Sequence, residues 1–540
     1  MRLIPLHRAS LILTALAALV TGILLATANL YLGELNQDEG WYLYASQRVS
    51  DGELPYRDFA FSQGPVFPFV YASVYSVVEK WGVGGGRVFT STLGFLATIL
   101  AAALAARLAP KPWKGEAALI AFILLSCNVY HSYFTTVVKT YSLCALLITG
   151  GLYLLAFSGG KRGTCVSAAS GVMLALASGV RLSSVVILPA AVIYLLMDSS
   201  NSRKAAPWMF VLGSGLTLLA VFAPFLVMSG ETARFWMLEY HTLRWTDGFM
   251  SSLIFKAGFI SRFVQAYFVA AGIGMFILVR WWFTGRPQPF IDSPRNVRSF
   301  MVLLWGVAGI ITIVHISAPF PYDDYQVIIM PVISAALAAG LVSVAARMKL
   351  PQDLDENSVN GSGMRGLGGF ILGICVLASF SSPLNQGWVV RDRDRIWWKI
   401  KDKPDLVQLR EAGAWIAGHV PQGNQLLTQD LYLAVEAGRA VPHGLDMGPF
   451  SYFPDWSREK AELYGVMNRG MLMELIRTAD APIAVFSGYS LSIRSPEIKE
   501  LPVGEQKELW QIVNERYELV KTIPYFGHAG TELKILEVKP

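Results

Sequence analysis

Two adjacent carboxylates, Asp38 and Glu39, follow the first long apolar run of this 540-residue chain, and Arg57 and Asp58 follow soon after. All four stand among aromatic residues in the stretch GELNQDEGWYLYASQRVSDGELPYRDFAFSQGPVFPFV, residues 33–70. A carboxylate can act as a general base toward a hydroxyl group that must attack an electrophilic carbon. An acid at the end of an apolar run therefore predicts such chemistry at a membrane surface.

Basic residues stand in short turns between later apolar runs. Lys139 lies in TTVVKTYSL and Arg181 in SGVRLSS, while the longer segment ETARFWMLEYHTLRWTDGF carries His241 and Arg244. Phosphate oxygens accept strong charge-assisted hydrogen bonds from Lys and Arg side chains. Cations from separate turns that face one carboxylate predict a transfer reaction with a phosphate leaving group.

The composition indicates a polytopic membrane protein. Hydrophobic residues make up 53% of the chain and charged residues only 16%, against about 25% charged in soluble domains. The net charge of +6 is modest and its basic residues stand in short loops, so nucleic acid is not a predicted partner. The four cysteines lie in or beside apolar runs and form no CxxC motif or disulfide frame.

Apolar runs long enough to cross a bilayer predict about 11 membrane spans. The first could also be a signal peptide with Ala26 and Ala28 at its cleavage site, although it is longer than the usual signal core. The run at 66–78 is short and follows Gly-Pro, so we expect a helix lying in the interface. The predicted spans are 10–32, 87–108, 116–134, 140–158, 164–180, 183–198, 207–229, 263–283, 299–318, 325–346 and 366–383.

Five loops agree on one orientation. With the amino terminus in the cytoplasm, alternate loops carry the basic residues, as the positive-inside rule requires. The chain is therefore predicted to be a multi-pass plasma-membrane protein with its carboxyl end extracytoplasmic and Asp38, Lys139 and Arg181 on that outer side. The basic residues of the five loops are Arg107, Lys111, Lys114, Lys161, Arg162, Arg203, Lys204, Arg286, Arg295, Arg298, Arg347, Lys349 and Arg365.

The composition changes after Pro383. Helical patterns at 404–419, 457–478 and 504–516 alternate with the strand-like segments NQLLT, APIAVF, YELVKTI and ELKILEV. The alternation predicts a small extracytoplasmic α/β domain at 384–540 after a transmembrane domain at 1–383, whose first outer loop, 33–86, carries interfacial helices. Residues 351–365 read as a polar linker. The α/β part contains no GxGxxG, P-loop or nucleophile-elbow motif.

Residues 33–100 resemble the start of the C-type membrane glycosyltransferases that use polyprenyl-phosphate sugars. The pattern is similar to that of protein O-mannosyltransferases and lipid A aminoarabinose transferases. An acidic pair follows the first span, and an aromatic-rich segment, a GxxPYxD turn, a Pro before an interfacial helix and an Arg opening the second span come after it. The resemblance implies an α-helical membrane fold of the GT-C type.

The resemblance also implies roles for individual residues. Asp38 matches the acid that faces the acceptor hydroxyl, with Glu39 as its neighbour in the catalytic pair. Lys139 and Arg181 match basic residues associated with the donor phosphate, and Arg57 is a third candidate. The candidate substrate-binding residues are Asp58, Tyr322, Asp323, Tyr325 and His241.

Two departures from the family pattern affect these roles. The aminoarabinose transferases carry an acidic and a basic residue before their double proline, whereas this chain has Ser62, Gln63 and Gly64 before Pro65. Arg57 and Asp58 are the pair that could replace them. The second acid that several relatives carry between the third and fourth spans is also absent, since KTYSLCALL contains no Asp or Glu.

Each candidate also has a purely structural reading. Asp38 and Glu39 could cap a helix, and Lys139 and Arg181 could extend from helix ends to the interface. Asp323 and Asp324 could form a solvated turn after Pro321. The lone histidines His241 and His315 could be ordinary hydrogen-bonded side chains, and the aromatic residues around Asp38 could form an interfacial belt.

The predicted function is inverting transfer of a sugar from a polyprenyl-phosphate donor to a lipid, glycan or protein hydroxyl, within membrane lipids. No cofactor or metal is predicted, because cations can stabilise a departing monophosphate; relatives that use diphosphate donors need a divalent cation. The alternatives are a transporter or flippase, which would carry charges near the bilayer midplane and an internal repeat, and a non-catalytic anchor for the outer domain.

Overall fold

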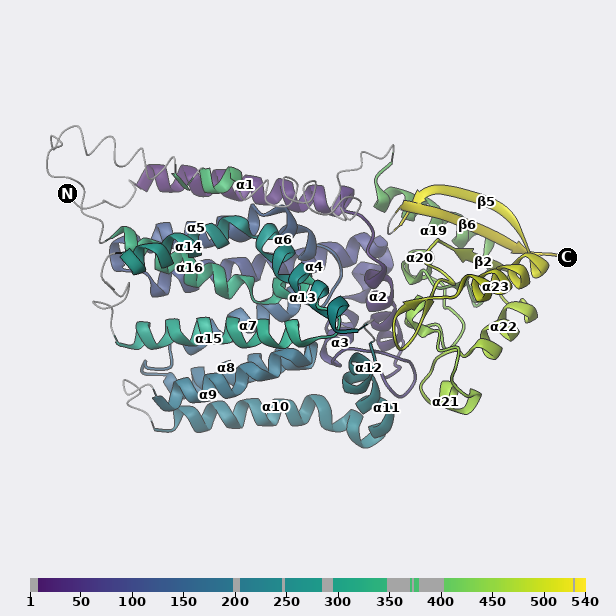
Figure 1. Ribbon diagram of the computed structural model, residues 1–540, viewed down its shortest axis with the longest axis horizontal. Helices are drawn as coiled ribbons and strands as arrows, with labels where there is room; N and C mark the ends of the chain where they lie inside the picture. Colours follow the sequence, from purple (N-terminus) through teal and green to yellow (C-terminus); the bar gives the residue numbers. More distant parts are fainter. Residues whose placement is uncertain are drawn as a thin grey trace.

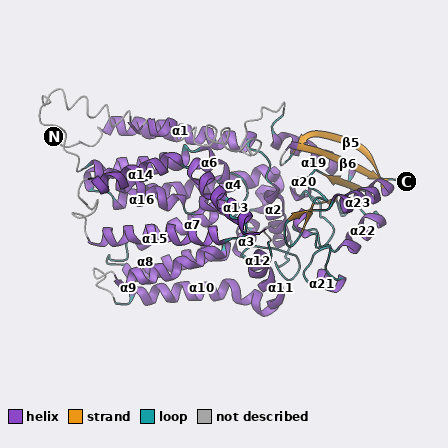
Figure 2. Ribbon diagram, viewed as in Figure 1, coloured by secondary structure: helices purple, strands orange, loops and turns teal. Residues whose placement is uncertain are grey.

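The computed structural model describes residues 8–197, 204–244, 248–283, 295–346, 370–371, 373–377, 403–527 and 530–540. Helices of residues 8–346 form one long bundle, and residues 403–540 form a mixed α/β unit at one end of it (Figure 1). Figure 2 shows the strands gathered in this unit. The site described below lies where the two parts meet.

Among the described residues, five helices are long and apolar enough to cross a membrane. A sixth crossing is possible by length if α13 (Gly248–Ala266) and α14 (Phe268–Phe283), which meet at a 90° bend, form one broken span. The five are α1 (Arg8–Leu32), α4 (Tyr75–Leu108), α8 (Gly163–Val180), α10 (Ala206–Met228) and α15 (Arg295–Ser317).

Several predicted spans are shorter or broken in the structure. The predicted span 116–134 divides into α5 (Lys114–Ser126) and α6 (Val129–Phe134), because the Asn128 side chain caps α6 by accepting the His131 N–H. The spans predicted at 183–198 and 325–346 open with the 3-10 turns η2 (Leu182–Val186) and η4 (Asp323–Ile328) before α9 (Ile187–Met197) and α16 (Met330–Ala345). The fourth predicted span corresponds to α7 (Tyr141–Leu155).

The predicted interfacial helix at 66–78 is also divided. It forms α3 (Val66–Ala72) and the first turn of α4, and α4 then kinks at Gly82, whose φ of 60° favours glycine. The predicted linker 351–365 and most of the predicted span 366–383 lie outside the described residues. The count of about 11 spans therefore stays a prediction.

Short helices lie between the bundle and the α/β unit (Figure 1). Helix α2 (Gln37–Ser50) follows α1 directly and carries the predicted acidic pair. The segment after α10 contributes three short helical turns that continue one another. They are α11 (Gly230–Arg234), the π-helical turn η3 (Phe235–Glu239) and α12 (Tyr240–Thr242).

The α/β unit contains a four-stranded sheet of order β1-β2-β6-β5, in which β1 and β2 are parallel and the other pairs are antiparallel. Each of the four segments predicted as strands overlaps one of these strands: β1 (Leu427–Thr428), β2 (Ile483–Phe486), β5 (Tyr517–Phe526) and β6 (Thr531–Val538). A second, short pair is β3 (Ile493–Arg494) with β4 (Lys499–Glu500).

Helices surround this sheet. The helix predicted at 457–478 is divided around Gly465, which has a φ of 65°. The helices are α19 (Asp405–His419), α20 (Leu431–Ala437), α21 (Arg458–Leu463), α22 (Arg469–Thr478) and α23 (Val503–Arg516). Helix α20 packs against α2, which brings the α/β unit next to Asp38.

Candidate active site

Helix α2 presents Asp38 at its first turn. Asn36 is the N-cap: its side chain accepts the Asp38 N–H at 3.1 Å, and the Glu39 carboxylate accepts the Asn36 N–H at 3.0 Å in a capping box. Capping is thus the task of Asn36 and Glu39 rather than of the Asp38 carboxylate. The Asp38 side chain, 30% exposed, accepts the Trp41 indole N–H at 3.2 Å and lines a cavity.

Lys139 connects Asp38 to a second acid. Its Nζ atom lies 3.0 Å from Asp38 Oδ2 and 3.0 Å from Asp324 Oδ2, and the Tyr141 hydroxyl donates to Asp324 Oδ2 at 2.9 Å. Burial alone would lower the pKa of Lys139, but Asp324 and Asp38 raise it well above its usual range. Lys139 therefore stays charged between two carboxylates, and the cluster of these three residues carries a net charge of −1.

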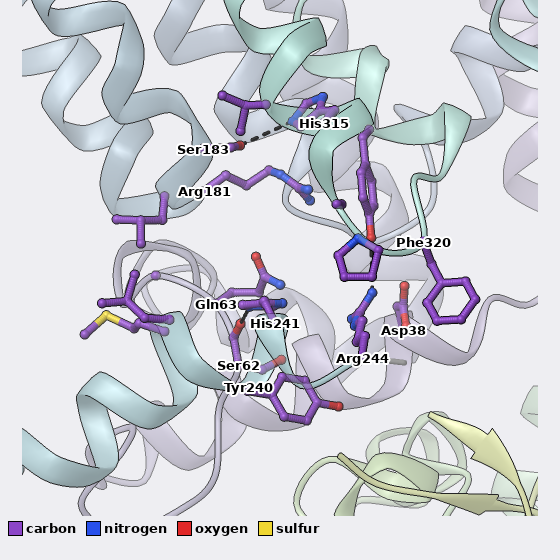
Figure 3. A pocket seen from close by; sticks show the side chains of 18 of the residues that line it. Asp38, Ser62, Gln63, Arg181, Ser183, Tyr240, His241, Arg244, His315 and Phe320 are labelled. Carbon is purple, nitrogen blue, oxygen red and sulfur yellow. Dashed lines mark hydrogen bonds between the residues drawn. The ribbon is translucent and has the colours of Figure 1, made fainter. Parts of the chain in front are cut away.

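The cavity next to Asp38 has a volume of about 460 Å³ and is lined by both parts of the molecule. Figure 3 shows side chains that the bundle part contributes, among them Asp38, Arg181 and His241. Helix α2, the loop before α3, the segments around Arg181 and His241, and the end of α15 all contribute to its wall. Met447, Phe450 and Ile498 close it from the α/β unit. The polar lining residues are Asp38, Tyr42, Ser62, Gln63, Tyr141, Arg181, Ser183, Tyr240, His241, Arg244, His315 and Tyr325.

Two arginines supply positive charge to this wall. Arg181 follows the last residue of α8, donates to Thr140 Oγ1 at 3.1 Å, and lies 5.1 Å and 4.9 Å from the ring centres of Tyr141 and Tyr325. Arg244 follows α12 and approaches the Tyr325 hydroxyl at 3.4 Å. The Nε atoms of both arginines are buried and have no hydrogen-bond partner among the described residues. Buried guanidinium donors of this kind can form charge-assisted hydrogen bonds to an anion.

His241 is a neutral member of the wall. Burial, and then the charge of Arg244, lowers the pKa of His241 to about 4. Its Nε2 atom lies 2.7 Å from the Ser62 carbonyl oxygen, so Nε2–H donates and Nδ1 keeps a lone pair. His241 thereby fixes the loop that presents Ser62 and Gln63 to the cavity.

A second histidine belongs to a hydrogen-bond chain on the bundle side. His315, only 3% exposed, contacts Ser183 Oγ at 3.3 Å through Nε2 (Figure 3) and the Gln326 amide at 3.2 Å through Nδ1. Thr312 Oγ1 lies 3.1 Å from Gln326 Oε1. This series of hydrogen bonds holds Ser183 in the cavity wall, close to Arg181.

The predicted site residues divide into two groups. Asp38, Arg181, His241 and Tyr325 line the cavity, and Lys139 is ion-paired to Asp38 behind it. The other predicted residues do not line it: Glu39, Arg57, Asp58, Tyr322 and Asp323.

Glu39 faces away from the cavity. Its carboxylate forms a doubly hydrogen-bonded pair with Arg87, at 2.8 and 2.7 Å, and both side chains are fully buried. It also accepts the Val138 N–H at 3.1 Å. The Glu39 carboxylate is therefore enclosed by structural donors and does not line the cavity, so this geometry does not support the predicted catalytic contact of Glu39 with substrate.

Arg57 and Asp58 pair with each other instead of with the cavity. Two hydrogen bonds of 2.9 and 2.7 Å join them, and Asp58 Oδ2 also accepts the Leu54 N–H at 2.8 Å. The pair closes the turn around Tyr56, whose φ is 67°. The pair does not line the cavity, whereas Ser62 and Gln63, which precede Pro65, do.

Asp323 and Tyr322 also lie beside the site rather than in it. Asp323 accepts hydrogen bonds from Arg262, at 2.8 Å, and from the Tyr130 hydroxyl. The Tyr322 side chain is 41% exposed. The neighbouring Asp324 forms an ion pair with Lys139. In the sequence, Asp324 could be recognised only as the second residue of the Asp323-Asp324 pair.

Comparison with known proteins gives the fold a name. Residues 62–228 match the family model described as dolichyl-phosphate-mannose-protein mannosyltransferase. Crystallised ArnT from Cupriavidus metallidurans in the apo state superposes with a TM-score of 0.62 at 12% identity, covering 96% of this chain and 97% of that chain. The chain has a C-type glycosyltransferase fold. Comparison with curated proteins finds no match.

Two further structures with this GT-C fold are similar to the chain. ArnT from the same organism bound to undecaprenyl phosphate gives a TM-score of 0.57 at 13% identity and covers 97% of both chains. The apo oligosaccharyltransferase of Archaeoglobus fulgidus gives 0.50 at 11% identity, covering 97% of this chain and 74% of that chain. The likeness extends over the GT-C bundle and the α/β unit together.

Proposed function

We propose that the chain is an inverting glycosyltransferase that moves a sugar from a polyprenyl-phosphate donor to a hydroxyl acceptor on the extracytoplasmic face of the membrane. The observation that carries this proposal is one carboxylate, Asp38, in the wall of the same cavity as Arg181 and Arg244. The likeness in fold to ArnT, which has been solved bound to undecaprenyl phosphate, supports the donor class.

Asp38 is the proposed general base. As the acceptor oxygen attacks the anomeric carbon, its proton passes to the Asp38 carboxylate. The bond between that carbon and the phosphate oxygen breaks, and its electron pair leaves with the polyprenyl phosphate. A single displacement of this kind inverts the anomeric configuration.

Asp324 makes Asp38 a stronger base. The cluster of Asp38, Lys139 and Asp324 has one carboxylate in excess, so a proton taken up by Asp38 brings its net charge to zero. An isolated Asp38–Lys139 pair would instead become positive. We therefore assign Lys139 to the positioning of Asp38 in preference to the donor phosphate expected from the sequence.

Arg181 and Arg244 are the proposed phosphate ligands. Both have a buried Nε donor without a partner among the described residues, and together they bring two positive charges. The leaving phosphate gains negative charge as the bond to the sugar breaks, so cations held in advance stabilise the transition state. His241 and Tyr325 are the proposed sugar-facing neighbours, whereas Arg57, Asp58, Tyr322 and Asp323 are proposed to support the site from outside.

The test is a transfer assay on the purified full chain. Radiolabelled polyprenyl-phosphate sugars are incubated with mixed envelope acceptors, and wild type is compared with Asp38→Asn and the matched control Asp455→Asn, an exposed acid of the α/β unit. We expect wild type and the control to transfer label and Asp38→Asn to lose about 100-fold or more in rate. Full activity of Asp38→Asn would refute the proposal, and label that crosses vesicle membranes without transfer would favour a flippase.

A further inference from the structure

Helix α2 packs against both the bundle and the α/β unit. A side-chain carbon placed on Gly40 would lie 2.3 Å from the backbone nitrogen of Tyr432, so the backbones of α2 and α20 are in direct contact there. Only glycine permits this approach. The contact lies two residues after Asp38, in the first turns of the helix that presents the proposed base.

A hydrogen-bond link precedes Asp38 by one residue. The Gln37 amide donates to Asp430 Oδ1 at 3.2 Å and to the Gln429 carbonyl at 3.3 Å. Asp430 is fully buried, and its Oδ2 accepts the Ser487 N–H and the Ser490 hydroxyl, both at 2.8 Å. Because Ser487 directly follows β2, the Asp430 carboxylate is fixed to the sheet, and Gln37 is fixed to the carboxylate.

The other end of α2 has its own attachments to the same unit. Arg48 Nη1 lies 3.2 Å from Oδ1 of Asp446, whose side chain is fully buried, and the Val441 N–H donates to the Tyr44 hydroxyl oxygen at 3.0 Å. The helix is thereby held at both ends, so it cannot rotate about its axis without breaking one of these contacts. Rotation is the motion that would carry Asp38 away from the cavity.

We propose that the α/β unit positions the catalytic base: it sets the orientation of α2, and Gln37 and Asp430 are positioning residues for Asp38. The inference rests on the proposed function and assigns a task to residues 403–540 within it. The same unit places Met447, Phe450 and Ile498 in the cavity wall. The α/β unit therefore fixes both the orientation of Asp38 and the part of the wall opposite the bundle.

Gln37→Met tests the link alone. Methionine keeps the length of the side chain, and Gln37 Oε1 is buried without a hydrogen-bond partner among the described residues, so only the two donated bonds are lost. We expect kcat to fall about 10- to 100-fold while KM for the donor changes less than about twofold. The matched control is Gln511→Met, an exposed glutamine bonded to Glu515, and it should keep wild-type kcat.

Hydrogen–deuterium exchange gives a readout that does not require activity. In Gln37→Met the backbone amides of residues 38–44 should exchange about 10-fold faster or more, while those of α4 keep wild-type rates. Unchanged kcat in an active protein, or unchanged exchange in α2, overturns the inference. A wild type that transfers no sugar would count against the proposed function only, and exchange in α2 would then decide the positioning role by itself.

Discussion

At the scale of single residues, neighbours in sequence have different tasks. Asp38 and Glu39 are adjacent on a helix, where successive side chains point about 100° apart, so one lines the cavity and the other binds Arg87. Asp323 and Asp324 differ in the same way: Asp323 pairs with Arg262 and Asp324 with Lys139. The resemblance singled out Asp38 of the first pair, but the residue types alone could not say that Asp324 rather than Asp323 contacts Lys139.

The charge of Asp324 is predicted to control the rate. In Asp324→Asn the Lys139 charge is balanced by Asp38 alone, which weakens Asp38 as a base, and kcat should fall about 10- to 100-fold. Donor affinity should be equal or higher, because the site becomes more positive. Steady-state kinetics check this, with Asp455→Asn, an exposed acid of the α/β unit, as control. A reduced donor affinity with unchanged kcat would contradict the assignment.

His241 is predicted to make the fold sensitive to acid. Its pKa is about 4 in the folded protein and about 6.5 in an unfolded chain. The unfolded state therefore binds the extra proton first, and stability present above pH 6.5 is lost as the pH falls toward 4. The free energy of unfolding of wild type should therefore fall between pH 7 and pH 5. In His241→Gln this fall should be smaller by about 2 kcal/mol.

Thermal denaturation in detergent at the two pH values measures this difference. His419→Gln is a suitable control, because His419 is an exposed histidine at the end of α19. Equal pH dependence in wild type and His241→Gln would show that His241 is not buried as a neutral side chain.

At the scale of elements, hydrophobic runs predicted where helices occur better than where they break. Runs of apolar residues such as 116–134 conceal polar residues that interrupt a helix: Asn128 caps α6 and also donates to the Ala266 carbonyl at 2.9 Å, beside the bend between α13 and α14. These tertiary bonds have no local signal. The strands and helices after residue 403 were more predictable, because their patterns alternate over short distances.

The Glu39–Arg87 pair is predicted to hold the elements around the site together. Arg87 also donates to the carbonyls of Leu30, Gly33 and Glu34 at the end of α1. Glu39→Gln leaves a fully buried guanidinium without its counter-charge, which should destabilise the fold by about 3 to 5 kcal/mol.

The measurement is the midpoint of thermal unfolding in detergent. The control is Glu411→Gln, whose partner Lys403 is exposed, and it should cost less than about 1 kcal/mol. A Glu39→Gln protein as stable as this control would mean that the buried pair contributes little.

At the scale of the whole molecule, the site belongs to neither part alone. The bundle supplies Arg181, Lys139 and His315, and the α/β unit supplies Met447, Phe450 and Ile498. The sequence predicted both parts from composition and periodicity. Their contact could not be predicted, because it depends on pairs such as Gln37 and Asp430 that are 393 residues apart.

The predicted orientation of the whole molecule can be tested with native cysteines. Cys165, near the start of α8, is exposed, whereas Cys127, Cys144 and Cys375 are buried. A membrane-impermeant maleimide should label Cys165 in inside-out vesicles and not in intact cells. Gly504→Cys in a Cys165→Ser background should give the opposite result, since a side chain at Gly504 meets open space. Labelling of Cys165 from outside would invert the topology.

The most direct test of the central claim is equilibrium binding of a polyprenyl-phosphate sugar to the purified protein, compared among wild type, Asp38→Asn and Arg181→Gln. If Asp38 acts as a base only in the transfer step, Asp38→Asn should bind the donor with wild-type affinity. If Arg181 binds the donor phosphate, Arg181→Gln should bind the donor at least about 10-fold more weakly. Equal binding by wild type and Arg181→Gln would contradict the account, because the donor phosphate would then lie elsewhere.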